Sequence, residues 1–248
     1  MYRVLWVTLF ILSVSNAGTI RIAVAANVSY AITPLIEAFN IVHPKTKVEV
    51  ILGSSGKLTA QITHGAPYDL LLSANMKYPE ALYAGKQAIS KPVIYAQGAL
   101  ALFSRKKRDY CAEIFVLKDT DIRKIAIANP KTAPYGEAAK EALINAKLYE
   151  MLKPKFVYGE SISQTVSYAK AATDIGIIAK SSLFSPQMQH YKEAIHWAEV
   201  DETLYTPIDQ GMVILHRAKE NVEVRAFYDF MLGARAKEIL KTFGYKTR

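Results

Sequence analysis

The stretch Gly53-Ser54-Ser55-Gly56 constrains this chain most, because it joins two segments of different periodicity. In residues 47–52, polar and apolar side chains alternate and several are β-branched, which predicts a strand. Residues 57–64 carry apolar side chains four positions apart, which predicts a short helix. The first turn of a helix offers unpaired N–H groups and a positive dipole end, and glycines let a ligand approach the backbone. We therefore expect this turn to bind a small oxyanion, with a plain connecting turn as the alternative.

Known catalytic and nucleotide-binding patterns do not match this turn. A phosphate-binding loop has four residues between its glycines and Ser or Thr after the lysine, but here the gap is two and Leu58 follows Lys57. The serine-hydrolase turn Gly-x-Ser-x-Gly also has a different spacing. The five histidines show neither the spacing of metal ligands nor that of a catalytic triad. The sequence has no pair of adjacent tyrosines, which a ferric-iron site would favour. We expect a binding protein and not an enzyme.

The N-terminal sequence predicts export. Arg3 precedes the apolar run 4–14, and Ser15 and Ala17 supply the small residues of a signal-peptide cleavage site, so we assign residues 1–17 to a signal peptide. A membrane anchor fits less well, because the run is shorter than the roughly 20 residues of a spanning helix. No cysteine follows the expected cut, so we predict a periplasmic protein that is not lipid-anchored. The single cysteine, Cys111, is expected to be a partly buried structural residue.

The formal net charge of +9 would favour the capture of anions. Nucleic acid and anionic lipid are alternative partners for a basic chain. However, the basic residues are scattered, and the one dense run, 105–108, is expected to be a solvated loop. No nucleic-acid-binding motif is present, so we predict no nucleic-acid partner.

Strands and helices alternate along the first half of the mature chain. Residues 19–26 predict a buried strand that ends at Asn27, and residues 28–42 predict a helix that Pro34 either kinks or separates from its first turn. Another buried strand is expected at 68–73. This alternation predicts a parallel α/β sheet, in which ligands bind beyond the carboxyl ends of the strands. Asn27 and Ser55 both fall at such ends.

A second βα series follows and predicts a second lobe. Strands at 93–96 and 99–103 flank Gln97-Gly98, which we interpret as a crossing between lobes, and residues 204–215 are expected to cross back. We therefore predict an α/β fold of two lobes, each a mixed sheet flanked by helices, joined by two crossing segments. The first lobe would comprise 18–95 with 206–248, and the second 96–205.

Several motifs, in this order, resemble the periplasmic molybdate-binding proteins of ABC importers. They are Val24-Ala25-Ala26-Asn27, Gly53-Ser54-Ser55-Gly56, Gly65-Ala66-Pro67-Tyr68-Asp69-Leu70, Asn129-Pro130 with Pro134-Tyr135-Gly136, Gly176-Ile177 and Ala226-Phe227-Tyr228-Asp229-Phe230. The resemblance spans nearly the whole mature chain and implies a two-lobed fold with the ligand in the interlobe cleft. It also implies a monomer without cofactor, which delivers the anion to an importer permease in the inner membrane.

The resemblance implies four ligand-binding positions. Asn27 follows the first strand, Ser55 would give its hydroxyl and backbone N–H, Tyr135 lies in the Pro-x-Gly loop, and Ile162 would give a backbone N–H from a helix start. Ala179 departs from the pattern, since some members have a donor tyrosine there, and we take Tyr135 as its replacement. The structural alternatives are a helix cap for Asn27, a packed loop aromatic for Tyr135 and ordinary helix core for Ile162.

These residue types suit a fully deprotonated anion. Asn, Ser, Tyr and helix-start amides can all donate, and none of the four positions carries a carboxylate. Phosphate keeps a proton near neutral pH, and a site without an acceptor would leave that proton unpaired at a cost of about 1–3 kcal/mol. Sulfate, molybdate and tungstate carry no such proton. The resemblance favours molybdate and tungstate, with the metal bound only as its oxyanion. The alternatives are sulfate or another small anion and, behind them, an enzyme on the same fold.

Overall fold

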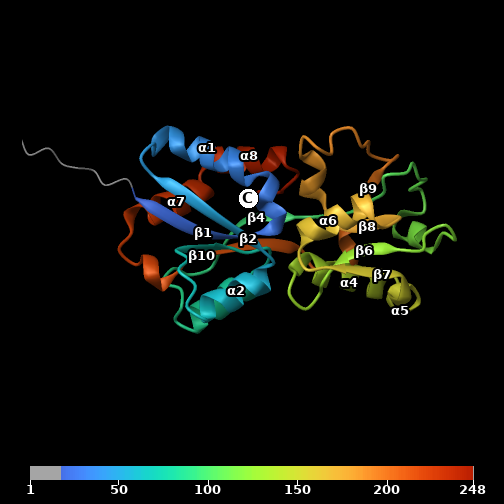
Figure 1. Cartoon of the computed structure of the whole chain (residues 1–248), viewed down its shortest axis with the longest axis horizontal. Coiled ribbons are helices and arrows are strands. Elements are labelled where there is room, and N and C mark those ends of the chain that lie inside the picture. The colour runs from blue at the N-terminus through green and yellow to red at the C-terminus, as the bar shows by residue number, and fades with distance from the viewer. Residues whose placement is uncertain (1–17, 248) are drawn as a thin grey trace, which may run out of the picture.

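The computed structural model describes residues 18–247, and the predicted signal peptide lies outside the described residues. The chain forms two lobes, each built on a five-stranded sheet (Figure 1). The strand order is β2-β1-β3-β10-β4 in the first lobe and β7-β6-β8-β5-β9 in the second. Both sheets contain parallel and antiparallel pairs, so the predicted two-lobed α/β fold is confirmed.

The first lobe combines segments from both ends of the chain. Its strands are β1 (Thr19–Ala25), β2 (Lys47–Gly53), β3 (Leu70–Leu72), β4 (Val93–Gly98) and β10 (Ile208–Ile214). Its helices are the 3-10 helix η1 (Ala26–Tyr30), α1 (Ile32–Val42), α2 (Ser55–Thr63), α3 (Lys77–Ala84), α7 (Val222–Leu232) and α8 (Ala234–Thr242). β1 and β2 are parallel and pair in register to Ala25 opposite Gly53, so both strands end at the same level. The turns that follow them therefore lie side by side.

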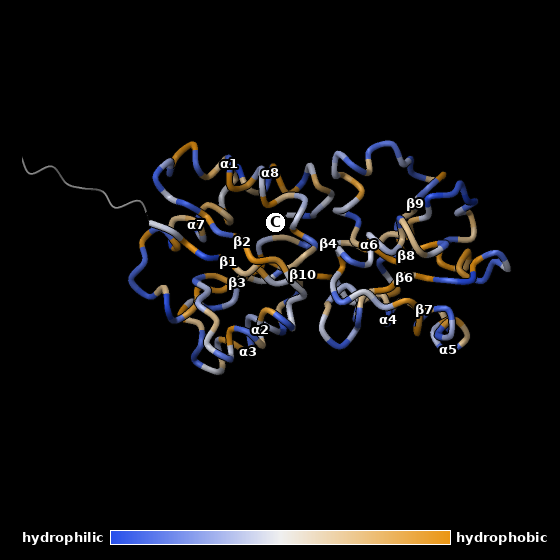
Figure 2. The backbone as a smooth tube through the Cα atoms, viewed as in Figure 1, coloured by the Kyte–Doolittle hydropathy of each residue, from blue (hydrophilic) through white to orange (hydrophobic). Residues whose placement is uncertain are grey.

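Helices cover both faces of the first sheet. Alternate β1 side chains pack on one face with Leu35 and Phe39 of α1, and on the opposite face Ala23 packs with Leu58 and Ile62 of α2. Because the second half of β1 is covered on both faces, residues 22–25 are all apolar and buried, as expected of a central parallel strand. Figure 2 shows hydrophobic residues concentrated along the strands, with hydrophilic residues frequent in the surrounding helices and loops.

The second lobe is formed by one continuous part of the chain. Its strands are β5 (Leu100–Phe103), β6 (Ile125–Ala128), β7 (Phe156–Gly159), β8 (Ile175–Ala179) and β9 (Trp197–Glu199). Its helices are α4 (Pro134–Asn145), α5 (Tyr149–Leu152) and α6 (Ile162–Ala171), with 3-10 turns between the elements. β6 pairs in parallel with β7 and β8, so the turns after β6 and β7 also emerge at one edge of the sheet.

Two strands of the first sheet lead into the crossings between the lobes. β4 ends at Gly98, separated by one residue from the start of β5 at Leu100, and β10 begins at Ile208, which is paired with Gly98. The C-terminal segment lies against the same place, because the backbones of Lys246 and Gln97 exchange two hydrogen bonds of 2.8 and 2.9 Å. The exact lobe boundaries, 18–95 with 206–248 and 96–205, stay a prediction.

Some local expectations were wrong or are now decided. The segment 28–42 was expected either to kink at Pro34 or to have a first turn separate from the main helix. The separate first turn is observed, since the 3-10 helix η1 precedes α1. Cys111 is exposed and not partly buried. Within the basic run, Arg108 departs from a solvated loop, because its side chain is only 6% exposed and is paired with Asp121. Among residues 18–247, no helix has the length and hydropathy that a membrane crossing needs.

Candidate ligand-binding site between the lobes

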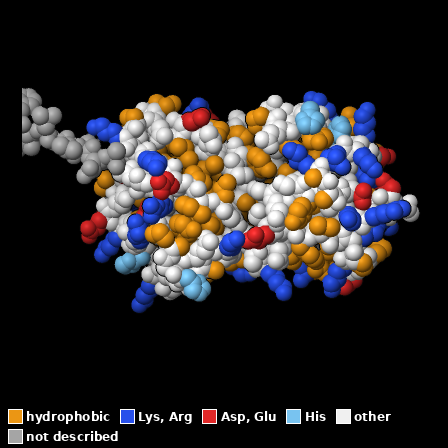
Figure 3. Space-filling view, viewed as in Figure 1, with side chains coloured by type: hydrophobic (Ala, Val, Ile, Leu, Met, Phe, Trp, Pro, Cys, Tyr) orange, Lys and Arg blue, Asp and Glu red, His pale blue; other side chains and the backbone are white. Residues whose placement is uncertain are grey.

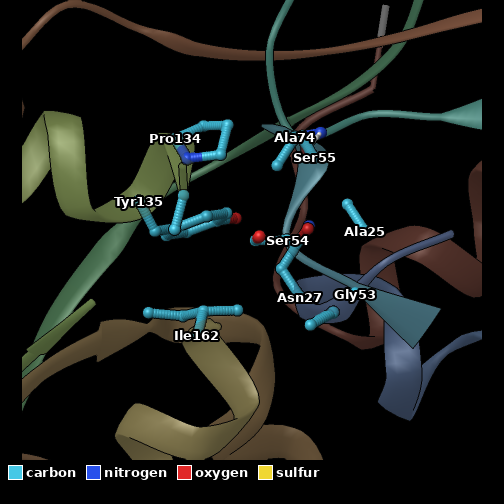
Figure 4. Close-up of a pocket in the computed structure, with 11 residues that line it drawn as sticks. Ala25, Asn27, Gly53, Ser54, Ser55, Ala74, Pro134, Tyr135 and Ile162 are labelled. Carbon is cyan, nitrogen blue, oxygen red and sulfur yellow. Dashed lines mark hydrogen bonds between the residues drawn. The ribbon is translucent and has the colours of Figure 1, made fainter. Parts of the chain in front are cut away.

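Four helices begin at one cavity between the lobes, two from each lobe. Asn27 is the second residue of η1, Ser55 the first of α2, Tyr135 the second of α4 and Ile162 the first of α6. All four predicted residues line this cavity, although they are up to 135 positions apart in the sequence (Figure 4). The first N–H groups of a helix have no partner inside it, and its dipole is positive there. The cavity is therefore surrounded by donors.

The cavity is small and its lining carries no charged side chain. The space in it that a water-sized molecule can enter is about 10 Å³, far below the roughly 300–1,000 Å³ of pockets for drug-sized ligands. The remaining lining residues are Ala25, Ala26, Gly53, Ser54, Ala74, Ala133 and Pro134. In Figure 4, Tyr135, Pro134 and Ile162 face Ser54, Ser55 and Asn27 across the cavity. On the face drawn in Figure 3, Lys and Arg side chains are scattered over both lobes. The lining itself favours a small ligand that is bound by neutral groups.

Two serines of the α2 turn offer hydroxyl groups to the cavity. The Ser55 Oγ accepts a hydrogen bond of 2.9 Å from the backbone N–H of Ala74, so its own proton remains for another acceptor. Ser54 Oγ is buried without a hydrogen-bond partner in the protein. An unpaired buried polar group costs about 1–3 kcal/mol. A ligand oxygen that accepts from Ser54 would remove this cost.

Tyr135 supplies the hydroxyl of the second lobe. The side chain is 1% exposed, and its Oη is buried without a partner. Burial is the main cause that raises the pKa of Tyr135 well above its usual value, so the phenol remains a donor throughout the physiological range. The predicted loop position was wrong, since Tyr135 lies inside the first turn of α4, which begins at Pro134.

Asn27 is held by three hydrogen bonds to two neighbours. Its Nδ2 donates to Gln210 Oε1 at 2.8 Å and to Tyr245 Oη at 2.9 Å, and its backbone carbonyl accepts from Tyr245 Oη at 2.9 Å. It is not a helix cap, because the N-cap residue of η1 is Ala25. Both amide protons are used in these bonds, whereas Oδ1 is buried and unpaired. For a ligand acceptor, Asn27 thus offers its backbone N–H in the first turn of η1.

The lobes touch around the cavity. The contacts are Ser163 Oγ to Ala26 O at 2.9 Å, Ser181 Oγ to Asn27 O at 3.1 Å, Gly56 N to Thr132 O at 2.9 Å, and the ion pair of Lys57 Nζ with Glu160 Oε1 at 2.6 Å. Each of these contacts joins a residue of the first lobe to one of the second, beside a cavity-lining turn. The lobes are therefore closed over the cavity in this structure.

Sequence reasoning missed three residues at the site. Ser54 could have been found, because it stands beside Ser55 in the same turn. Gln210 and Tyr245 carried no local signal, since only tertiary packing brings them to Asn27. Ala179 ends β8 and is not among the residues that line the cavity. Within the described part of the chain, no three His, Cys, Asp or Glu side chains lie together as a metal site would need.

Comparisons with known proteins agree with this architecture. Residues 20–246 match the model of a family described as bacterial extracellular solute-binding protein. A molybdate-binding protein of Rhodobacter capsulatus is 36% identical over 93% of this chain and 89% of its own, and one of Azotobacter vinelandii is 34% identical over 93% and 91%.

The solved structure of the Azotobacter vinelandii periplasmic molybdate-binding protein superposes with a TM-score of 0.85 at 30% identity, and covers 92% of this chain and 99% of its own. The family resemblance that the motifs indicated is thereby confirmed. The chain belongs to the bacterial extracellular solute-binding proteins.

Proposed function

We propose that this protein captures molybdate, and also tungstate, in the interlobe cavity and delivers the anion to an ABC importer. The observation that carries the proposal is the convergence of four helix N-termini on a small cavity without charged side chains. Helix N-termini bind oxyanions through N–H groups and the positive end of the dipole. The relatives named as molybdate-binding proteins support this choice of anion.

Asn27, Ser55, Tyr135 and Ile162 are the proposed ligand-binding residues, and Ser54 joins them. Ser54, Ser55 and Tyr135 would donate from hydroxyls, while the helix starts at Asn27, Ser55 and Ile162 would donate from the backbone. Molybdenum or tungsten would be held only through the oxygens of its anion. No cofactor is needed for this task, because binding and release involve no covalent chemistry.

Transport requires the cavity to open and close. Each lobe supplies two of the four helix starts, so an anion would draw the lobes together by bonding to both. The hydrogen bonds from Ser163 and Ser181 to carbonyls of the first lobe would form on closure. We propose that the closed monomer then docks on the permease at the outer face of the cytoplasmic membrane, after export into the periplasm and without a lipid anchor.

Calorimetric titration of the protein beginning at Gly18 with molybdate, tungstate, sulfate and phosphate at neutral pH tests the proposal. We expect one-to-one binding of molybdate and tungstate, with sulfate and phosphate much weaker.

Tyr135→Phe should weaken molybdate binding. Tyr110→Phe is the matched control, because it removes a buried hydroxyl bonded to His196 O at 2.7 Å but not one that lines the cavity.

The other outcomes separate the alternatives. If sulfate or phosphate binds most tightly, the anion site stands but the assigned substrate is wrong. If none of the four anions binds, the cavity is not an oxyanion site, and the proposed function fails.

A further inference from the structure

We propose that Gln210 and Tyr245 are positioning residues of the anion site, which hold Asn27 and so fix the first turn of η1. The inference rests on the proposed function. Neither residue lines the cavity, and both lie far from Asn27 in the sequence. Both residues act by orienting Asn27, without contacting the anion themselves.

The hydrogen bonds around Asn27 leave its amide one orientation. Gln210 Nε2 donates to the carbonyl of Ile208 at 3.0 Å, so Gln210 must turn its Oε1 toward Asn27. Asn27 must in turn present Nδ2, and Tyr245 Oη accepts the second proton of that group while it donates to the Asn27 carbonyl. Asn27, Gln210 and Tyr245 are 1%, 0% and 3% exposed, so water cannot replace these partners.

These hydrogen bonds hold both the side chain and the backbone of Asn27. Gln210 and Tyr245 fix the side chain of Asn27, and Tyr245 also fixes its carbonyl. The peptide N–H of Asn27 belongs to the first turn of η1, which lines the cavity and whose first N–H groups have no partner within the helix. Preorganised donors bind more tightly than donors that must be ordered on binding. Loss of either neighbour should therefore weaken the anion site without removing any group that touches the ligand.

The network also joins the site to the crossings. Gln210 lies on β10, two residues after Ile208, which pairs with Gly98 of β4. The register of this strand pair shifts directly after Gln210. Tyr245 precedes Lys246, whose backbone is bonded to Gln97 of β4. Ser181 of the second lobe adds a bond to the same Asn27 carbonyl. Asn27 is thus held by both strands that lead into the crossings, one directly and one through the C-terminal segment.

A double-mutant cycle measured by calorimetry with molybdate tests this role. Tyr245→Phe and Gln210→Met, which keep shape but lose the hydrogen bonds, should each weaken molybdate binding about tenfold. Gln210→Met combined with Asn27→Ala should bind no more weakly than Asn27→Ala alone, because Gln210 contacts residue 27 only through the side chain that Asn27→Ala removes. Tyr110→Phe is the control for loss of a buried tyrosine hydroxyl, and should leave affinity unchanged.

Two results would overturn the proposal in distinguishable ways. If the wild-type protein binds molybdate but Tyr245→Phe and Gln210→Met bind as tightly, or if the effects of Gln210→Met and Asn27→Ala simply add, the residues are structural and the function stands. If the wild-type protein binds no oxyanion, the proposed function fails and this inference fails with it. Melting temperatures of all variants show whether a loss of affinity reflects unfolding; Tyr245→Phe and Tyr110→Phe should melt similarly.

Discussion

The two lobes contribute to the cavity in different ways. In the first lobe, two polar side chains at the cavity are held by their own lobe, Ser55 by the N–H of Ala74 and Asn27 by Gln210 and Tyr245, whereas the Ser54 hydroxyl has no partner. In the second lobe, the Tyr135 hydroxyl has no hydrogen-bond partner, and Ile162 can offer only its backbone. The first lobe is therefore the preorganised half of the site, and the second completes it on closure. Such a division lets the anion bind first to donors that need no rearrangement.

The largest effect is expected from Gly98→Ala, where the two lobes meet. A Cβ at Gly98 would lie 2.0 Å from Tyr135 Oη and 3.0 Å from Gln210 Nε2, so it must displace the donor of the second lobe and crowd the support of Asn27. We expect molybdate affinity to fall about a hundredfold, with a smaller loss of thermal stability. Calorimetry and a melting curve check this. Unchanged affinity would show that the Tyr135 hydroxyl is not needed at this position.

Ser55→Ala compared with Tyr135→Phe tests the division between the lobes directly. Ser55→Ala removes a donor and also leaves the Ala74 N–H without its partner, whereas Tyr135→Phe removes a hydroxyl that has no partner in the protein. We expect Ser55→Ala to weaken molybdate binding by about twentyfold or more and Tyr135→Phe by about tenfold or less. The opposite order, measured by calorimetry on both variants, would contradict a preorganised first lobe.

High pH should destabilise the fold through its buried tyrosines. Burial raises the pKa of Tyr245 to about 12, above the value near 10 of an unfolded chain. Between these values the unfolded chain has lost the proton that the native protein keeps, so the stability that is complete below pH 10 declines as pH rises toward 12. The free energy of unfolding should fall by up to about 1.4 kcal/mol per pH unit for this group.

Denaturant unfolding of the wild type and of Tyr245→Phe at pH 8, 10 and 11 measures this contribution. The variant should lose less stability than the wild type over that range. Equal losses in both proteins would mean that Tyr245 titrates as in the unfolded chain.

The smallest effect is expected from the ion pair at the edge of the cavity. Lys57 and Glu160 join the two lobes at 2.6 Å, but their side chains are 52% and 60% exposed. Exposed pairs contribute little and are screened by salt. Lys57→Met should therefore increase the rate of molybdate release by about threefold or less at low salt, in stopped-flow measurements. Glu160→Gln is the matched partner variant, and a large effect of either at high salt would contradict this interpretation.

The fold and the positions of Asn27 and Ser55 could be predicted from local patterns, whereas Tyr135 and Ile162 were implied only by the family resemblance. Parallel strands end at one edge of a sheet, so turns such as the one at Ser55 had to lie near each other once strands and helices were recognised. Gln210 and Tyr245 could not be found this way, since their role depends on contacts across about 180 or more residues. Exposure was also poorly predicted at Cys111, because residue type alone does not determine which loop faces solvent.

The position of β10 in the first sheet has a consequence for how the chain folds. β10 lies between β3 and β4, although it follows them in the chain by more than 100 residues and after the whole second lobe. The first sheet therefore cannot be completed until the second lobe has been made, whereas the second lobe can collapse from one continuous segment. Long-range pairing of this kind slows folding. We expect the middle of the chain to fold first and the anion site, which needs both lobes, to form last.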